Sequence, residues 1–89
     1  MQESLKDIQR APGIGKSLAA DLYAIGIRSL DDLKTKDPQK LYDASNRHVG
    51  AIQDPCVLYA FRCVVYFART PKPEVELTKW WNWKDRELH

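Results

Sequence analysis

Apolar residues recur at helical spacing along most of the chain, and the breaks between them fall at glycine and proline. The first such segment runs from Glu3 to Arg10 and ends before Pro12, because the residue before a proline is pushed out of helical geometry. The second runs from Lys16 to Ile25, and Gly26 follows where a left-handed cap is common. No segment shows the alternation typical of a strand. The pattern therefore predicts an all-α fold.

Three further helix starts carry capping signals. Ser29 predicts a short helix from Leu30, with Asp32 where the partner of a capping box would stand. Asp37 before Pro38 predicts a helix to about Arg47, followed by a loop from His48 to Gln53. Asp54 before Pro55 repeats this signal and predicts a helix that ends at Arg69. The chain should therefore form a compact bundle of about five helices.

The helix from Pro55 to Arg69 is apolar on nearly every side, which is typical of a central helix covered by others. Arg62 and Arg69 mark its one polar stripe, where we expect a solvated face with an ion pair rather than an extension of a phosphate-binding track. Cys56 and Cys63 also stand seven residues apart, so their Cα atoms would lie roughly 10 Å from each other, too far for a disulfide. We expect two buried free thiols rather than a metal or redox pair, and no metal site.

The end of the chain carries a cluster of aromatic residues, Trp80-Trp81-Asn82-Trp83. After a proline-rich turn, we expect residues 74 to 85 to form a last short helix that packs on the core, with indole N–H groups reaching polar partners. Consecutive tryptophans cannot all point inward, so at least one should stay partly exposed. Beside Lys84, such an indole suits base stacking on a single strand. It equally suits a patch for a partner protein.

Length and charge limit the function classes. Eighty-nine residues suggest one domain, with residues 1–27 as a helical hairpin, 28–69 as the remaining helices and 70–89 as the tail. The net charge is only +2, which permits nucleic-acid binding without requiring it. The N-terminus lacks the apolar core of a signal peptide, and the longest apolar stretch is too short for a membrane span. We expect a cytoplasmic protein.

The segment Ala11-Pro12-Gly13-Ile14-Gly15 reads as a tight turn between two helices. The first N–H groups of a helix have no intrahelical partner and lie at the positive end of its dipole, so a glycine turn there suits a phosphate. With the apolar residues around it, the turn resembles the helix-hairpin-helix motif of DNA-repair and replication proteins. The candidate phosphate-binding residues are Gly13, Ile14, Gly15, Lys16 and Ser17, with Ile14 pinning the turn to the core.

The resemblance extends further along the chain. Gly26-Ile27-Arg28-Ser29 and the Asp-Leu pair that follows look like the C-terminal domains of the bacterial RNA polymerase alpha subunit and of the competence regulator family TfoX, which implies a SAM-like helical fold. With the stretches from Cys56 to Cys63 and from Trp80 to Asp85, the chain resembles the small bacterial family labelled "pathogenicity locus", sometimes called a mitomycin-resistance protein. That resemblance covers nearly the whole chain.

These features predict a non-enzymatic module that holds the DNA backbone along the minor groove without reading sequence. No nucleophile–base arrangement or carboxylate cluster is evident, and no cofactor is expected. Only one Gly-x-Gly turn is present, so binding should be weak unless a homodimer supplies a second. The alternative is a protein-interaction module of the same fold, in which the turn merely joins two helices and no nucleic acid is bound.

Overall fold

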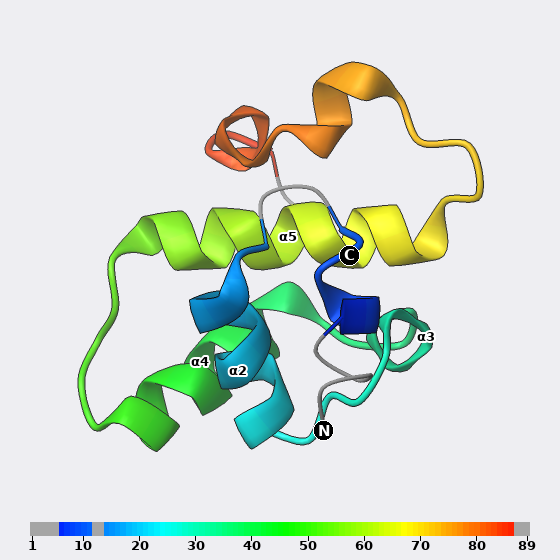
Figure 1. Cartoon of the computed structure of the whole chain (residues 1–89). Helices are drawn as coiled ribbons and strands as arrows, with labels where there is room; N and C mark the ends of the chain where they lie inside the picture. The colour runs from blue at the N-terminus through cyan, green and yellow to red at the C-terminus, as the bar shows by residue number, and fades with distance from the viewer. Residues whose placement is uncertain (1–5, 12–13, 87–89) are drawn as a thin grey trace.

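The computed structural model describes residues 6–11 and 14–86, and within these the fold is all-α, as predicted. A helical turn at residues 6–8 precedes the helices labelled in Figure 1. They are α2 (Lys16–Ala24), α3 (Leu30–Leu33), α4 (Pro38–Val49) and α5 (Pro55–Arg69), followed by the 3₁₀ helices η1 (Val75–Thr78) and η2 (Trp80–Trp83). No strand forms in the described residues, and none of their helices is long and apolar enough to cross a membrane.

Side chains cap the starts of α3, α4 and α5 at the predicted positions. The Ser29 hydroxyl accepts a hydrogen bond from the backbone N–H of the third helical residue at 3.3 Å. The carboxylates of Asp37 and Asp54 each accept one from the second helical residue at 2.9 Å. The expected partner in the capping box, Asp32, accepts instead from the N–H of Arg28, one residue ahead of the cap.

Glycines in the left-handed region end α2 and α4. Gly26 has φ 103°, and the N–H of Ile27 returns to the carbonyl of Leu22 at 2.9 Å, so α2 closes with the predicted left-handed cap. Gly50, with φ 75°, ends α4. That helix runs about two residues further than predicted, so His48 lies in its last turn and not in a loop.

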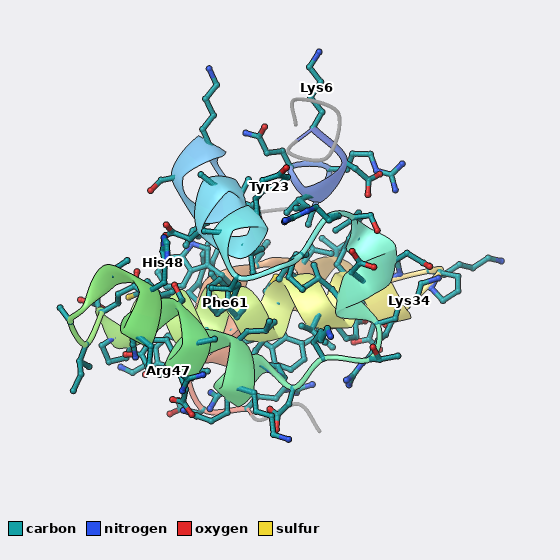
Figure 2. The ribbon with its side chains drawn as sticks, turned by 90° about the horizontal axis from the view of Figure 1, so that it is seen from below. Lys6, Tyr23, Lys34, Arg47, His48 and Phe61 are labelled. Carbon is teal, nitrogen blue, oxygen red and sulfur yellow. The ribbon has the colours of Figure 1, made fainter. Side chains whose placement is uncertain are left out.

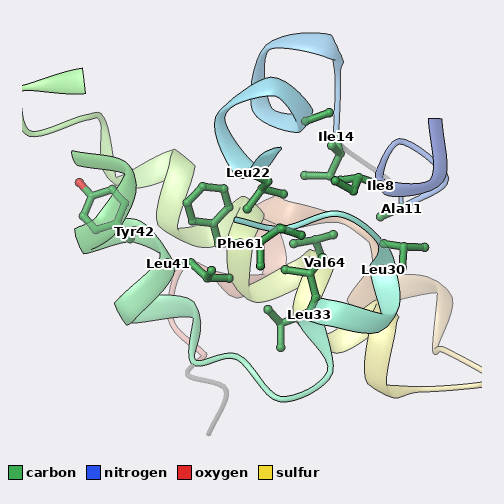
Figure 3. Packing of buried hydrophobic residues seen from close by; sticks show 13 residues of the cluster. Ile8, Ala11, Ile14, Leu22, Leu30, Leu33, Leu41, Tyr42, Phe61 and Val64 are labelled. Carbon is green, nitrogen blue, oxygen red and sulfur yellow. The ribbon is translucent and has the colours of Figure 1, made fainter. Parts of the chain in front are cut away.

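Helix α5 forms the centre of the molecule, as its composition predicts. Figure 1 shows the tail crossing one side of α5 while α2, α3 and α4 lie on the other. Gathered around Phe61 and Val64 in Figure 3 are Leu22 of α2, Leu33 of α3 and Leu41 of α4. Both α5 side chains are fully buried. The three helices therefore meet on one face of α5 and share a single core.

The tail differs from the single helix predicted for residues 74–85. It forms two 3₁₀ turns separated by Lys79, whose backbone is extended at φ −102° and ψ 117°. This break turns Trp83 onto α5, where it is 2% exposed and donates its indole N–H to the carbonyl of Leu77 at 2.9 Å. Trp81 is 56% exposed. In a continuous α-helix the carbonyl of Leu77 would accept from the backbone N–H four residues later, instead of from the indole of Trp83.

The prediction of two buried thiols is right for Cys63 and wrong for Cys56, which is exposed. Cys56 lies in the first turn of α5, ahead of the tightly packed part that begins at Ala60. Cys63 lies under the tail, and burial raises the pKa of its thiol to about 11. Because the two cysteines stand seven residues apart, their side chains leave α5 in nearly the same direction. Neighbouring elements cover only Cys63.

The solvated arginine stripe expected on α5 is only partly exposed, because both arginines are half-buried and donate to backbone carbonyl groups. Arg62 donates to the carbonyl of Trp83 at 2.9 Å and so holds the tail. Arg69 donates to the carbonyls of Lys34 and Lys36 at 2.7 and 2.9 Å. These bonds tie the end of α5 to the chain just after α3.

Candidate nucleic-acid interface

The predicted phosphate-binding residues divide between core and surface. Ile14 is 7% exposed, whereas Gly15, Lys16 and Ser17 are exposed at the start of α2. Gly13, the fifth predicted residue, lies outside the described residues. Three predicted residues therefore lie together at an exposed corner of the molecule, which is the start of α2. The residue before them, Ile14, is buried.

Apolar contacts hold this corner to the core. Ile8 and Ala11, from the segment before the turn, are buried and lie near Ile14 in Figure 3. Ala19 and Leu22, on the inner side of α2, are fully buried. The carboxylate of Asp7 also accepts a hydrogen bond from the N–H of Leu30 at 2.8 Å, which ties the first segment to the start of α3. Buried apolar residues therefore lie on both sides of the turn in the chain, and the segment before it is tied to α3.

The N-terminus of α2 differs from the other helix starts. Among α2, α3, α4 and α5, only α2 has no side-chain hydrogen bond at its N-cap, because that residue is Gly15. A Cβ atom added to Gly15 would meet no atom within 4 Å, and its φ of −85° suits any residue. Neither packing nor backbone conformation explains a glycine there. Because glycine has no side chain, the N-cap residue of α2 offers no acceptor to the first-turn N–H groups.

Local charge at this corner is modestly favourable to an anion. The first turn of α2 holds Lys16 and no acidic residue. Figure 2 shows Lys6 projecting on the same side of the molecule as α2. Arg10 is engaged in an ion pair with Asp7 at 3.5 Å. Lys16 is therefore the cation in the first turn itself, and Lys6 adds positive charge on the same side of the molecule.

An apolar pocket of about 260 Å³ lies next to the first turn of α2. Its walls are Leu18 of α2, Cys56, Val57 and Ala60 of α5, and Trp80 of η2. Spacing along the chain gave no signal for this pocket, because Leu18 and Trp80 stand 62 residues apart. The pocket therefore joins two features that sequence reasoning treated separately, the start of α2 and the tryptophan cluster.

One residue that lines this pocket, Cys56, has an exposed thiol. A hydrogen bond with the Asp54 carboxylate raises the pKa of Cys56, and the nearby Lys84 ammonium opposes this rise. The same contact, led by the backbone N–H of Cys56, lowers the pKa of Asp54. Cys56 is therefore an accessible but weakly nucleophilic thiol.

A larger groove of about 690 Å³ lies where the first segment and α3 meet the end of α5. Arg10, Lys34 and Arg69 line it together with Asp7 and Asp31. Acidic and basic side chains therefore both line the groove, and the Lys34 ammonium forms an ion pair with the Asp31 carboxylate at 2.7 Å. This groove therefore has less of the character of an anion-binding surface than the start of α2. Within the described part of the chain, no three His, Cys, Asp or Glu side chains gather as a metal site would need.

Comparison with known proteins gives one match. Searches of curated proteins and of solved structures found nothing similar to the chain. Residues 1–88 match the family Cdd1, described as "Pathogenicity locus". This match spans nearly the whole sequence, as the resemblance of its motifs implied. The chain belongs to the pathogenicity-locus family.

Proposed function

We propose that this protein is a non-enzymatic DNA-binding module that holds the phosphate backbone at the N-terminus of α2 without reading base sequence. The observation that carries the proposal is the start of α2. Gly15 stands where α3, α4 and α5 each have a capping side chain, and a Cβ atom at Gly15 would meet no atom within 4 Å. A phosphate oxygen placed there would accept the N–H bonds that a cap otherwise accepts.

Each residue has a separate role in this binding. The N–H groups of the first turn donate to phosphate oxygens, and the helix dipole favours the negative charge. Lys16 adds an ammonium group and Ser17 a hydroxyl donor, and both side chains are exposed. Ile14 holds the turn against the core and makes no contact with DNA. Gly13 belongs to the proposed turn by its place in the sequence. Contacts of this kind orient a nucleic acid but carry no sequence information.

The small positive charge sets the expected strength. With two or three phosphates engaged, each contributing about −0.9, log K should fall with log salt at a slope of about −1.8 to −2.7. Raising salt from about 50 to about 200 mM would then weaken binding roughly 10- to 40-fold. A homodimer would present two such turns, and sedimentation with and without DNA would detect it.

Charge reversal at Lys16 is the direct test, measured by fluorescence anisotropy with labelled DNA at two salt concentrations. Lys16→Glu should abolish most binding and reduce the salt slope by about 1 or more. A glutamate in the first turn of a helix favours folding, so a loss cannot be assigned to unfolding. Lys40→Glu is the matched control, because Lys40 lies beside Gly26 at the opposite end of α2. Unchanged binding by Lys16→Glu would contradict the proposal.

A second variant separates folding from binding. Gly15→Ser adds a hydroxyl that can cap α2, so it should raise the free energy of unfolding by a few tenths of a kcal/mol. The same hydroxyl would compete with phosphate for the first-turn N–H groups, so DNA affinity should fall. A variant that is more stable and binds DNA normally would show that these amides do not contact phosphate.

One observation favours the alternative, a protein-interaction module that binds no nucleic acid. Trp81 is 56% exposed, and exposed aromatic residues are enriched at protein interfaces. This alternative predicts no DNA binding even at low salt, and a partner whose affinity depends on Trp81 and not on Lys16. Lys16→Glu and Trp81→Ala, each tested for binding, therefore distinguish the two functions.

A further inference from the structure

We propose that the DNA held by this protein is single-stranded, and that an unpaired base enters the pocket between the first turn of α2 and η2 to lie against Trp80. This inference rests on the proposed phosphate contact at α2 and deepens it. It adds a base site to a backbone site. The two can fail separately, and the experiments below are chosen for that reason.

Leu18 connects the two sites. It is the third residue of α2, so its N–H group belongs to the uncapped first turn. Its side chain forms one wall of the pocket, and Trp80 forms another. A phosphate at the start of α2 therefore lies next to the pocket. A nucleotide bound there would present its sugar and base to the apolar walls.

The walls of the pocket suit a base. Aromatic rings stack on nucleobases without regard to sequence, because every base has a π face. Trp80 packs edge-on against Trp81, with ring centroids 5.7 Å apart and planes at 85°. The exposed Trp81 thus extends the aromatic surface beyond the pocket. Small-molecule pockets commonly exceed about 300 Å³, so a hollow of about 260 Å³ suits one planar group better than a large ligand.

Charge around the pocket matches a nucleic-acid strand. Lys84, which follows η2, lies near enough to Cys56 to influence its thiol. Lys16 stands in the first turn of α2, two residues before the wall residue Leu18. One cation therefore lies near the pocket, and another lies at the proposed phosphate contact. Single-strand binding proteins commonly combine cations for the backbone with aromatic rings for the bases.

The same geometry disfavours a duplex as the preferred ligand. In a duplex each base is paired and stacked on its neighbours, so its face cannot reach Trp80. A duplex could satisfy the N–H groups of α2 but would leave the pocket empty. The base site therefore predicts a preference for the single strand, whereas the phosphate contact alone predicts none.

The first experiment compares a labelled thymine oligonucleotide with the same strand annealed to its complement, by fluorescence anisotropy. The native protein should bind the single strand more tightly. Trp80→Leu keeps an apolar side chain but removes the π face, so it should weaken single-strand binding about tenfold or more and leave duplex binding unchanged. Val75→Ala is the control, because it trims an exposed apolar residue of η1, which does not line the pocket. Equal affinity of the native protein for both DNAs would overturn the proposal.

The second experiment uses the native chain and so does not depend on how a variant folds. Cys56 is exposed at the pocket, and Cys63 is buried, so a thiol reagent should modify Cys56 first. A saturating thymine oligonucleotide should slow the modification of Cys56 several-fold. A saturating duplex, which brings similar charge without filling the pocket, should slow it much less. Equal protection by both DNAs, or no protection, would overturn the base site.

The two proposals fail in different ways. If neither DNA binds, both are wrong. If both DNAs bind equally, depend on Lys16 and leave Cys56 unprotected, the phosphate contact stands and the base site is wrong. If the single strand protects Cys56 and Lys16→Glu abolishes binding to it, both stand.

Discussion

Replacing Trp83 by alanine should remove much of the stability of this protein, even though the residue lies close to the end of the chain. Trp83 is 2% exposed and packs on Tyr66 of α5 with ring centroids 5.3 Å apart. Its indole N–H donates to the carbonyl of Leu77, and its own carbonyl accepts from Arg62. The side chain of Trp83 thus connects η1 to α5, and its backbone carbonyl adds a second link to α5.

The size of the effect follows from this burial. Truncating a buried tryptophan to alanine typically costs about 3–5 kcal/mol, through lost burial and the cavity left behind. A chain of this length has a free energy of unfolding of roughly 4–13 kcal/mol. For a small domain each kcal/mol lowers Tm by about 4–8 °C, so Trp83→Ala should lower Tm by more than about 12 °C.

Urea and thermal unfolding, followed by circular dichroism, would measure the change. Trp83→Phe is the informative intermediate, because it keeps an aromatic ring but removes the hydrogen bond to Leu77, so it should cost clearly less. Trp81→Ala, which truncates the exposed neighbour, should cost under about 1 kcal/mol. If Trp83→Ala were no more harmful than Trp81→Ala, the tail would not be part of the core, and the reasoning from burial would be refuted.

Three further predictions concern stability. Gly26→Ala should cost about 1–2 kcal/mol in urea unfolding, because φ of 103° is strained for a residue with a Cβ; an unchanged midpoint would contradict this. Arg69→Gln should cost about 1 kcal/mol by the same assay, since charged bonds to the carbonyls of Lys34 and Lys36 are lost but lie near solvent, whereas a gain in stability would argue against that role. Burial raises the pKa of Cys63 from 9.0 to about 11, so its contribution is complete below pH 9.0 and is lost as pH rises to about 11. Native protein should therefore lose stability across that window more steeply than Cys63→Ala, and equal slopes would exclude the effect.

The helix starts could be predicted from the sequence because their causes are local. Asp37 and Asp54 cap the helices that begin at the prolines after them, and each bond spans only two residues. The end of α2 at Gly26 is equally local, since its hydrogen bonds close within one turn. Such elements need no knowledge of what packs on them.

The errors arose where distant segments decide the outcome. Cys56 and Cys63 share a direction from α5, but only Cys63 lies beneath the tail. Arg62 was assigned to a solvated stripe, yet it reaches a carbonyl 21 residues away. The tail breaks at Lys79, and η2 beyond the break packs Trp83 on α5. None of these contacts leaves a periodic signal in the chain.

The candidate site has one part that local sequence predicts and another that depends on contacts between distant segments. Gly15, Lys16 and Ser17 could be identified from a short motif, and the structure adds that the start of α2 has no side-chain cap. The position of Trp80 beside Leu18 could not be identified, because it depends on how the tail crosses α5. From the sequence alone, the aromatic cluster suits base stacking on a single strand or a patch for a partner protein. Its place next to the start of α2 means that one ligand can contact both, so an effect of the tryptophans on binding does not by itself argue for a protein partner. Dependence on Lys16 is what separates the two functions.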